Sequence, residues 1–144
     1  MPFRMDKLTI KAQEAIVGAQ SLAASQGNPE IEGLHLLSTL LEDPAGVVVA
    51  LLKKIGTQLD KLQSTTASEL QRLPRSSNGR QPGISASLQK GLDAAASSAE
   101  AMKDEFVSTE HLLMGLAKAD KNTSELLRLF GINEKDILQG LQTV

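Results

Sequence analysis

At residues 31–37 the chain reads IEGLHLL, and at residues 107–113 it reads VSTEHLL. The histidines of the two stretches, His35 and His111, are 76 residues apart, a little over half of the 144-residue chain. Upstream, apolar residues at helical spacing match at the same offset: Ala12, Ile16, Ala19 and Ala23 pair with Leu88, Leu92, Ala95 and Ala99. Downstream the match shifts by one residue, so that LLKKIG at 51–56 pairs with LLRLFG at 126–131. Because the period is far longer than that of a solenoid repeat, we expect one duplicated helical unit whose copies close together.

Helical periodicity and terminating residues predict an all-α, pseudo-twofold fold: a duplicated four-helix repeat, about eight helices in one domain over residues 1–144. The first repeat covers about residues 6–73 and the second about 84–142, joined by a polar loop at 74–83. The expected helices of the first repeat are about 9–26, 33–42, 46–55 and 58–73. The expected N-caps include Thr9, Ser85, Ser108 and, for a short helix that ends at Gly131, Thr123. No strand is predicted.

The composition excludes several classes of function. The chain is 41% hydrophobic and 22% charged, which is typical of a soluble globular domain. Because cysteine is absent, disulfides and thiolate metal sites are excluded, and a cytoplasmic location is expected. A net charge of −2 and only three aromatic residues argue against nucleic-acid binding. The longest uncharged apolar run, residues 45–52, is too short for a membrane span, and the N-terminus lacks the apolar core of a secretory signal.

The two histidines are the first candidates for chemistry. If Glu32 and Ser108 are N-caps, each histidine lies at the third helical position, where its ring nitrogen can accept from the cap backbone N–H. The alternative is a metal or acid–base site, but neither histidine has partners at a ligand spacing. We therefore favour the capping role. No catalytic or nucleotide-binding motif occurs, so we expect no enzymatic activity, no cofactor and no metal in this chain.

Four acidic residues gather before and at the start of the expected sixth helix: Glu100, Asp104, Glu105 and Glu110. Glu110 lies in the first turn of that helix, where the helix dipole favours a carboxylate. These acids form either a solvated charged rim or the rim of a binding surface, and the sequence leaves both open.

Several motifs in order resemble the Clp N-terminal domain repeat. They are Leu8-Thr9 opening an amphipathic helix, TEHLLMGL at 109–116, and Leu126-Leu127 before Gly131. The resemblance covers about residues 6–141. The stretch ELQRLP at 69–74, before a longer loop, resembles the ClpB branch of the family. The TEHLL stretch at 109–113 also resembles the ClpA and ClpC branches.

The resemblance implies a substrate-recognition domain at the front of a hexameric AAA+ disaggregase of the stress response. Such a domain contacts unfolded or aggregated protein before the ATPase ring threads it. The parent protein is expected to bind ATP and Mg²⁺ and to act as a homohexamer with a co-chaperone, and the isolated domain is expected to be a monomer. The ATPase modules are absent, and the ending GLQTV without a stop-like tail favours an excised domain. The alternative is an adaptor-docking domain of a protease-linked ClpA/ClpC-type unfoldase.

The resemblance also implies a substrate-facing surface. Thr9, Asp104 and Glu110 match polar positions of the ClpB-type surface. We expect a shallow groove at the seam of the two repeats, with these polar residues around it. The expected lining on the fifth helix is Leu92, Ala94 and Ser98, of which Ala94 and Ser98 are smaller than a strongly apolar lining requires.

Overall fold

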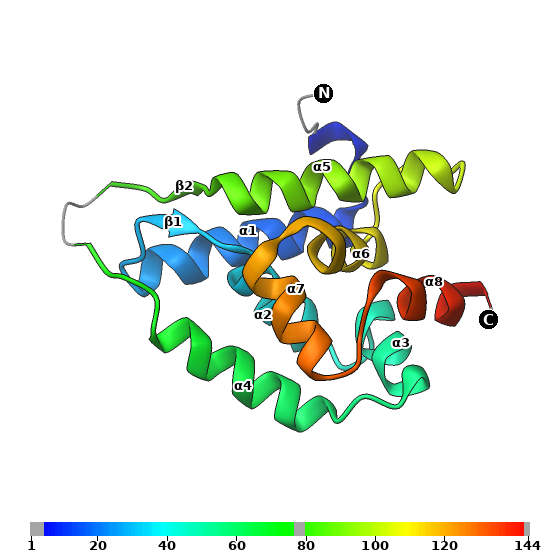
Figure 1. The fold of residues 1–144 in the computed structure, drawn as a ribbon. Helices are drawn as coiled ribbons and strands as arrows, with labels where there is room; N and C mark the ends of the chain where they lie inside the picture. Colours follow the sequence, from blue (N-terminus) through cyan, green and yellow to red (C-terminus); the bar gives the residue numbers. More distant parts are fainter. Residues whose placement is uncertain (1–4, 77–79, 143–144) are drawn as a thin grey trace.

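The computed structural model describes residues 5–76 and 80–142, so residues 77–79 of the predicted loop lie outside the described part (Figure 1). Eight α-helices, a 3₁₀ turn and two very short strands occur in these residues, which confirms the all-α prediction. The first repeat contains η1 (Met5–Lys7), α1 (Ile10–Ser25), β1 (Glu30–Ile31), α2 (Gly33–Glu42), α3 (Val47–Ile55) and α4 (Leu59–Gln71). The second contains β2 (Gly83–Ile84), α5 (Ala86–Ala101), α6 (Thr109–Ala119), α7 (Lys121–Leu129) and α8 (Glu134–Gln142).

The predicted caps of α1 and α5 are confirmed. The Thr9 hydroxyl accepts the Ala12 N–H at 3.2 Å, and the Ser85 hydroxyl accepts the Leu88 N–H at 3.0 Å. The cap predicted for α7 is wrong, because this helix begins three residues earlier than a cap at Thr123 implies. Asp120 caps it instead, and its side chain accepts the Thr123 N–H at 3.1 Å. Thr123 is instead completely buried.

The prediction of no strand is also wrong, and the two strands explain how the repeats are joined. β1 pairs with β2 in parallel, with Ile31 opposite Ile84, and an isolated parallel bridge joins Leu8 to Val107. Leu8 and Ile84 are equivalent at the 76-residue offset, as are Ile31 and Val107. Each repeat therefore pairs the segment before its first helix with the segment before the second helix of the other repeat.

The core lies between the repeats and consists mainly of leucine. In Figure 1, α5 runs across the top of the view and α4 across the bottom, with α2, α6 and α7 between them. The closest approach is that of α5 and α6, where Gly115 lies against the α5 backbone: a Cβ there would be 2.7 Å from the Ala95 nitrogen. The equivalent position of the first repeat is Thr39, whose hydroxyl donates to the Ala15 carbonyl at 2.9 Å. A side chain thus lies between α1 and α2 where none fits between α5 and α6.

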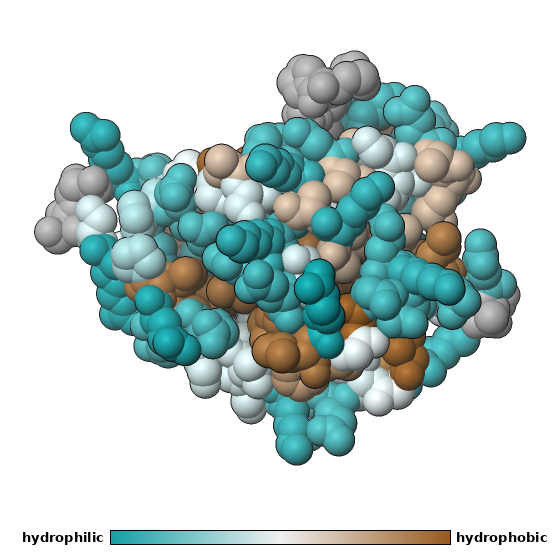
Figure 2. Space-filling model, viewed as in Figure 1, coloured by the Kyte–Doolittle hydropathy of each residue, from teal (hydrophilic) through white to brown (hydrophobic). Residues whose placement is uncertain are grey.

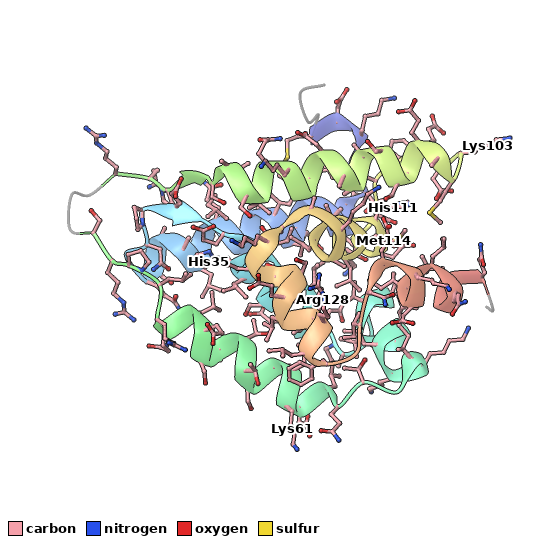
Figure 3. All side chains as sticks on the ribbon, in the orientation of Figure 1. His35, Lys61, Lys103, His111, Met114 and Arg128 are labelled. Carbon is pink, nitrogen blue, oxygen red and sulfur yellow. The ribbon has the colours of Figure 1, made fainter. Side chains whose placement is uncertain are left out.

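The turns after α1 and α5 have the same backbone form but different residues. Gly27 has φ of +71° and the equivalent Lys103 has φ of +61°. In both turns the next residue donates its N–H back to the helix, from Asn28 to Ala23 and from Asp104 to Ala99. The left-handed conformation costs about 1–2 kcal/mol for a residue with a Cβ. Lys103, at the end of α5 in Figure 3, therefore holds a strained backbone.

Replacing Lys103 by glycine should stabilise the protein by about 0.5–1 kcal/mol, because relief of strain exceeds the entropy that glycine adds to the unfolded chain. Urea denaturation monitored by circular dichroism measures the change. The matched control is Lys90→Gly, inside α5 and also exposed, which should destabilise by about 1 kcal/mol. A loss of stability in Lys103→Gly would contradict the strain argument.

Candidate functional site

His35, the third residue of α2, is buried and has the predicted capping role. Its Nδ1 accepts the Glu32 backbone N–H at 2.8 Å, so the ring is neutral and carries its proton on Nε2. Nε2 donates to the Asn28 side-chain oxygen at 2.9 Å, and the Asn28 amide donates to the Pro74 carbonyl at 2.9 Å. These hydrogen bonds, from His35 to Asn28 and from Asn28 to Pro74, therefore connect the start of α2 and the start of the inter-repeat segment to the turn after α1.

His111 repeats this arrangement in α6 with one change of charge. Nδ1 accepts the Ser108 backbone N–H at 2.9 Å, and Nε2 donates to the Asp104 carboxylate at 2.9 Å. Asp104 is the equivalent of Asn28 at the 76-residue offset. Figure 3 shows the two histidines well apart, one in each repeat. Among the described residues, no group of three potential ligands that includes either histidine could hold a metal ion.

The stability of the protein should decrease as the pH falls below about 6.5, in part through His35. Burial lowers the pKa of His35 below its ordinary value of 6.5, so the unfolded chain binds more protons than the folded one in this range. The His35 contribution is complete above pH 6.5 and is lost as the pH falls. Urea denaturation at several pH values between 5 and 8 measures it. In His35→Gln, which can still accept the Glu32 N–H, the decrease should be smaller; an identical pH profile would contradict this role.

An open groove of about 710 Å³ lies between α1, the corner from α2 to α3, and the start of α6. We call it the α1/α3 groove. Its apolar floor includes Ala15, Leu40 and Val48, and Val47 adds a side chain that is 49% exposed. Its remaining lining residues are Thr9, Lys11, Glu14, Gly18, Thr39, Glu42, Asp43, Ala45, Gly46, Ser108, Thr109 and Glu110. The groove thus combines residues of both repeats, with an apolar floor and a polar rim.

At the corresponding place in the second repeat, residues of that repeat fill the space among the residues that the structure describes. Asp120 and Thr123, at the start of α7, are buried against Gly33, where a Cβ would lie 2.5 Å from the Thr123 hydroxyl. The Asp120 side chain also approaches Gly91 of α5. The offset between the repeats changes by one residue within Asp43-Pro44-Ala45-Gly46, the connection between α2 and α3. The first repeat therefore has no counterparts of the Asp120 and Thr123 side chains in its groove. The duplicated fold therefore has an asymmetric surface.

The predicted site residues fall into three groups in the structure. Thr9 and Glu110 line the α1/α3 groove. Asp104 lies outside that lining and holds His111, with its side chain 47% exposed. The expected lining on the fifth helix is not brought together with the groove: Leu92 is 1% exposed and belongs to the core, Ser98 is 9% exposed, and Ala94 is half-buried. The groove at the seam is formed by α1 and α3 instead, because α5 packs too closely on α6 to leave an opening between them.

A smaller open pocket of about 350 Å³ lies on the surface between α4 and α7. We call it the α4/α7 surface. Leu129, at the end of α7, is 82% exposed there, and the neighbouring ion pair joins Arg72 to Glu69 at 3.4 Å. Figure 2 shows mostly hydrophilic side chains over this face, with an apolar patch over the lower part of α7. The charged residues that line this α4/α7 surface are Glu69, Arg72 and Glu125.

Sequence reasoning missed Asn28, Val47 and Asp43. Asn28 gave a usable signal, because it is equivalent to Asp104 at the same offset as the histidines that the two residues contact. Val47 and Asp43 gave no such signal, because the groove that they line depends on the angle of 90° between α2 and α3.

Among the helices that the structure describes, none has by itself the length and hydropathy that a membrane span requires.

Comparison with known proteins finds the Clp repeat (R) N-terminal domain, whose family model matches residues 7–130. The chaperone protein ClpB of Rhodopirellula baltica is 46% identical over 144 residues, which are 100% of this chain and 16% of that protein. The chaperone protein ClpB of Bacillus anthracis is 33% identical over 144 residues, covering 97% of this chain and 17% of that protein. The chain thus spans about a sixth of the length of these relatives.

Solved structures share the fold. The Hsp104 N-terminal domain from Candida albicans has a TM-score of 0.82 at 21% identity, covering 93% of this chain and 88% of that one. A ClpV N-domain in complex with a VipB peptide has a TM-score of 0.77 at 22% identity, covering 97% of this chain and 94% of that one. At these identities the likeness concerns the arrangement of the helices.

Proposed function

Because the chain belongs to the Clp N-terminal domain family and to the N-terminal region of ClpB-type AAA+ chaperones, we propose that it recognises clients for a protein disaggregase. The observation that carries the proposal is the α1/α3 groove, which offers an apolar floor with the exposed side chain of Val47. A client of this kind shares exposed apolar side chains and free backbone rather than a sequence, and a shallow groove with an apolar floor suits such segments.

The proposed binding is weak. The groove admits a short segment, so the buried interface stays well below about 1,200 Å², the lower bound of stable protein interfaces. We expect dissociation constants of about 10–500 μM. Six copies in the proposed parent hexamer would recover affinity through effective concentration, while each contact releases its client easily. The parent protein would bind ATP and Mg²⁺, act together with a co-chaperone, and be located in the cytoplasm.

An NMR titration of this domain with an unfolded polypeptide tests the groove. Shifts should cluster on residues 9–18, 39–48 and 108–110, with saturation at one site per chain because the equivalent place in the second repeat is filled. Val47→Ser should raise the dissociation constant roughly 3- to 10-fold by removing apolar contact area. Leu129→Ser, on the α4/α7 surface, is the matched control and should leave it unchanged.

The outcomes separate the alternatives. Shifts confined to the α4/α7 surface, or none with any unfolded client, would contradict the proposal. Binding of a single defined adaptor peptide, with no response to unfolded polypeptides, would instead indicate the adaptor-docking function of a protease-linked ClpA/ClpC-type unfoldase.

A further inference from the structure

The rim of the α1/α3 groove is strongly acidic. It carries four carboxylates, Glu14, Glu42, Asp43 and Glu110, and one basic side chain, Lys11, so its formal charge is −3. The whole chain has a net charge of only −2. The negative charge of the protein is therefore concentrated at the groove.

Within residues 5–76 and 80–142, one of these carboxylates has a basic partner. Lys11 lies 3.7 Å from Glu14, with side chains that are 72% and 62% exposed. Among the residues that the structure describes, Glu42, Asp43 and Glu110 have no lysine or arginine within ion-pair distance. The Asp43 carboxylate accepts the backbone N–H of Ala45 at 3.0 Å. Three carboxylates thus face the groove without a counter-charge.

Helix ends reduce this charge but do not reverse it. The starts of α1, α3 and α6 and the end of α2 all lie at the groove. With about half a charge at each end, positive at the start of a helix and negative at its end, they contribute about +1 in total. The groove therefore retains about two negative charges, which favour a cationic occupant.

From these charges we infer that the α1/α3 groove selects client segments in which lysine or arginine accompanies apolar residues, with Glu42, Asp43 and Glu110 determining the specificity. The inference rests on the proposed client binding and names its substrate class. Lysine and arginine suit both parts of the groove, because their aliphatic stems cover apolar surface while their charged ends remain at the hydrated rim. Segments rich in aspartate or glutamate would be repelled.

The test uses three unfolded peptides with one apolar core, flanked by lysine, glutamine or glutamate. Fluorescence anisotropy at about 50 mM and about 500 mM salt gives each affinity. At low salt we expect the lysine peptide to bind roughly 10-fold more tightly than the glutamate peptide, with glutamine between them. At high salt the difference should fall below about 3-fold, because exposed charges are screened within a few ångström.

Two variants locate the effect. Glu42→Gln combined with Glu110→Gln should bring the three affinities within about 2-fold of one another at low salt. Glu42→Lys alone changes the formal charge by the same two units and should have a similar effect. The matched control is Glu125→Gln on the α4/α7 surface, which should leave the 10-fold preference unchanged. Thermal melts verify that each variant is folded.

The two proposals fail in different ways. Equal binding of the three peptides at low salt, with shifts in the groove, would overturn the charge selectivity and leave client binding intact. Preference for the glutamate peptide would overturn it as well. Absence of binding by all three peptides, at either salt concentration, would contradict client binding itself.

Discussion

Gly115→Ala should lower the free energy of unfolding by about 2–3 kcal/mol, although alanine is the better helix former by about 1 kcal/mol. The new methyl group would contact the Gly91 carbonyl and come within 2.7 Å of the Ala95 nitrogen. Both contacts are with the backbone of α5, so relief requires the two helices to separate rather than a side chain to move. Urea denaturation measures the loss.

Gly83→Ala is the matched control for this substitution. Gly83 lies in β2, its φ is not positive, and an added Cβ would meet no atom within 4 Å. Its unfolding free energy should change by less than about 0.5 kcal/mol. If Gly115→Ala were equally mild, α5 and α6 could separate at little cost, and the close approach would not be needed for the fold.

Neither repeat should fold alone. Chains of residues 1–76 and 80–144 should each lack a cooperative thermal transition, because α2 and α3 of the first repeat pack against α6, α7 and α8 of the second. Each fragment would also lose the strand partner that the other supplies. Circular dichroism melts of each fragment measure this directly. An equimolar mixture is the control, and it should recover a cooperative transition at high concentration.

A cooperative melt of either fragment near that of the intact chain would show that each repeat has an independent core. The single-domain description over residues 1–144 would then be wrong. The same result would remove the physical basis for a groove built from both repeats.

The helices were predictable because local patterns specify them. The apolar stripe of Ala12, Ile16, Ala19 and Ala23 and the cap at Thr9 involve residues within one or two turns of each other. The structure confirms the cap and buries the three alanines, with Ile16 partly buried against the core. The capping role of the histidines followed for the same reason, since each ring contacts a backbone three residues away.

The strands and the groove were not predictable in this way. β1 and β2 are two residues each and pair across a sequence separation of 53 residues, too short to produce an alternating pattern. The groove depends on packing differences between equivalent positions, such as Thr39 against Gly115. A sequence repeat predicts equal surfaces on both halves, and substitutions at a few such positions decide which half stays open.

The crossed strand pairing has a consequence for the origin of the fold. A polypeptide of one repeat could form these backbone bonds only with a second copy, by exchanging its first segment with that copy. The architecture is therefore that of a segment-swapped homodimer within one chain. Fusion through the inter-repeat connection replaces an encounter between two molecules by a millimolar effective concentration, so assembly no longer depends on how much protein is present. It also frees the halves to diverge, since a change in one is no longer copied in the other.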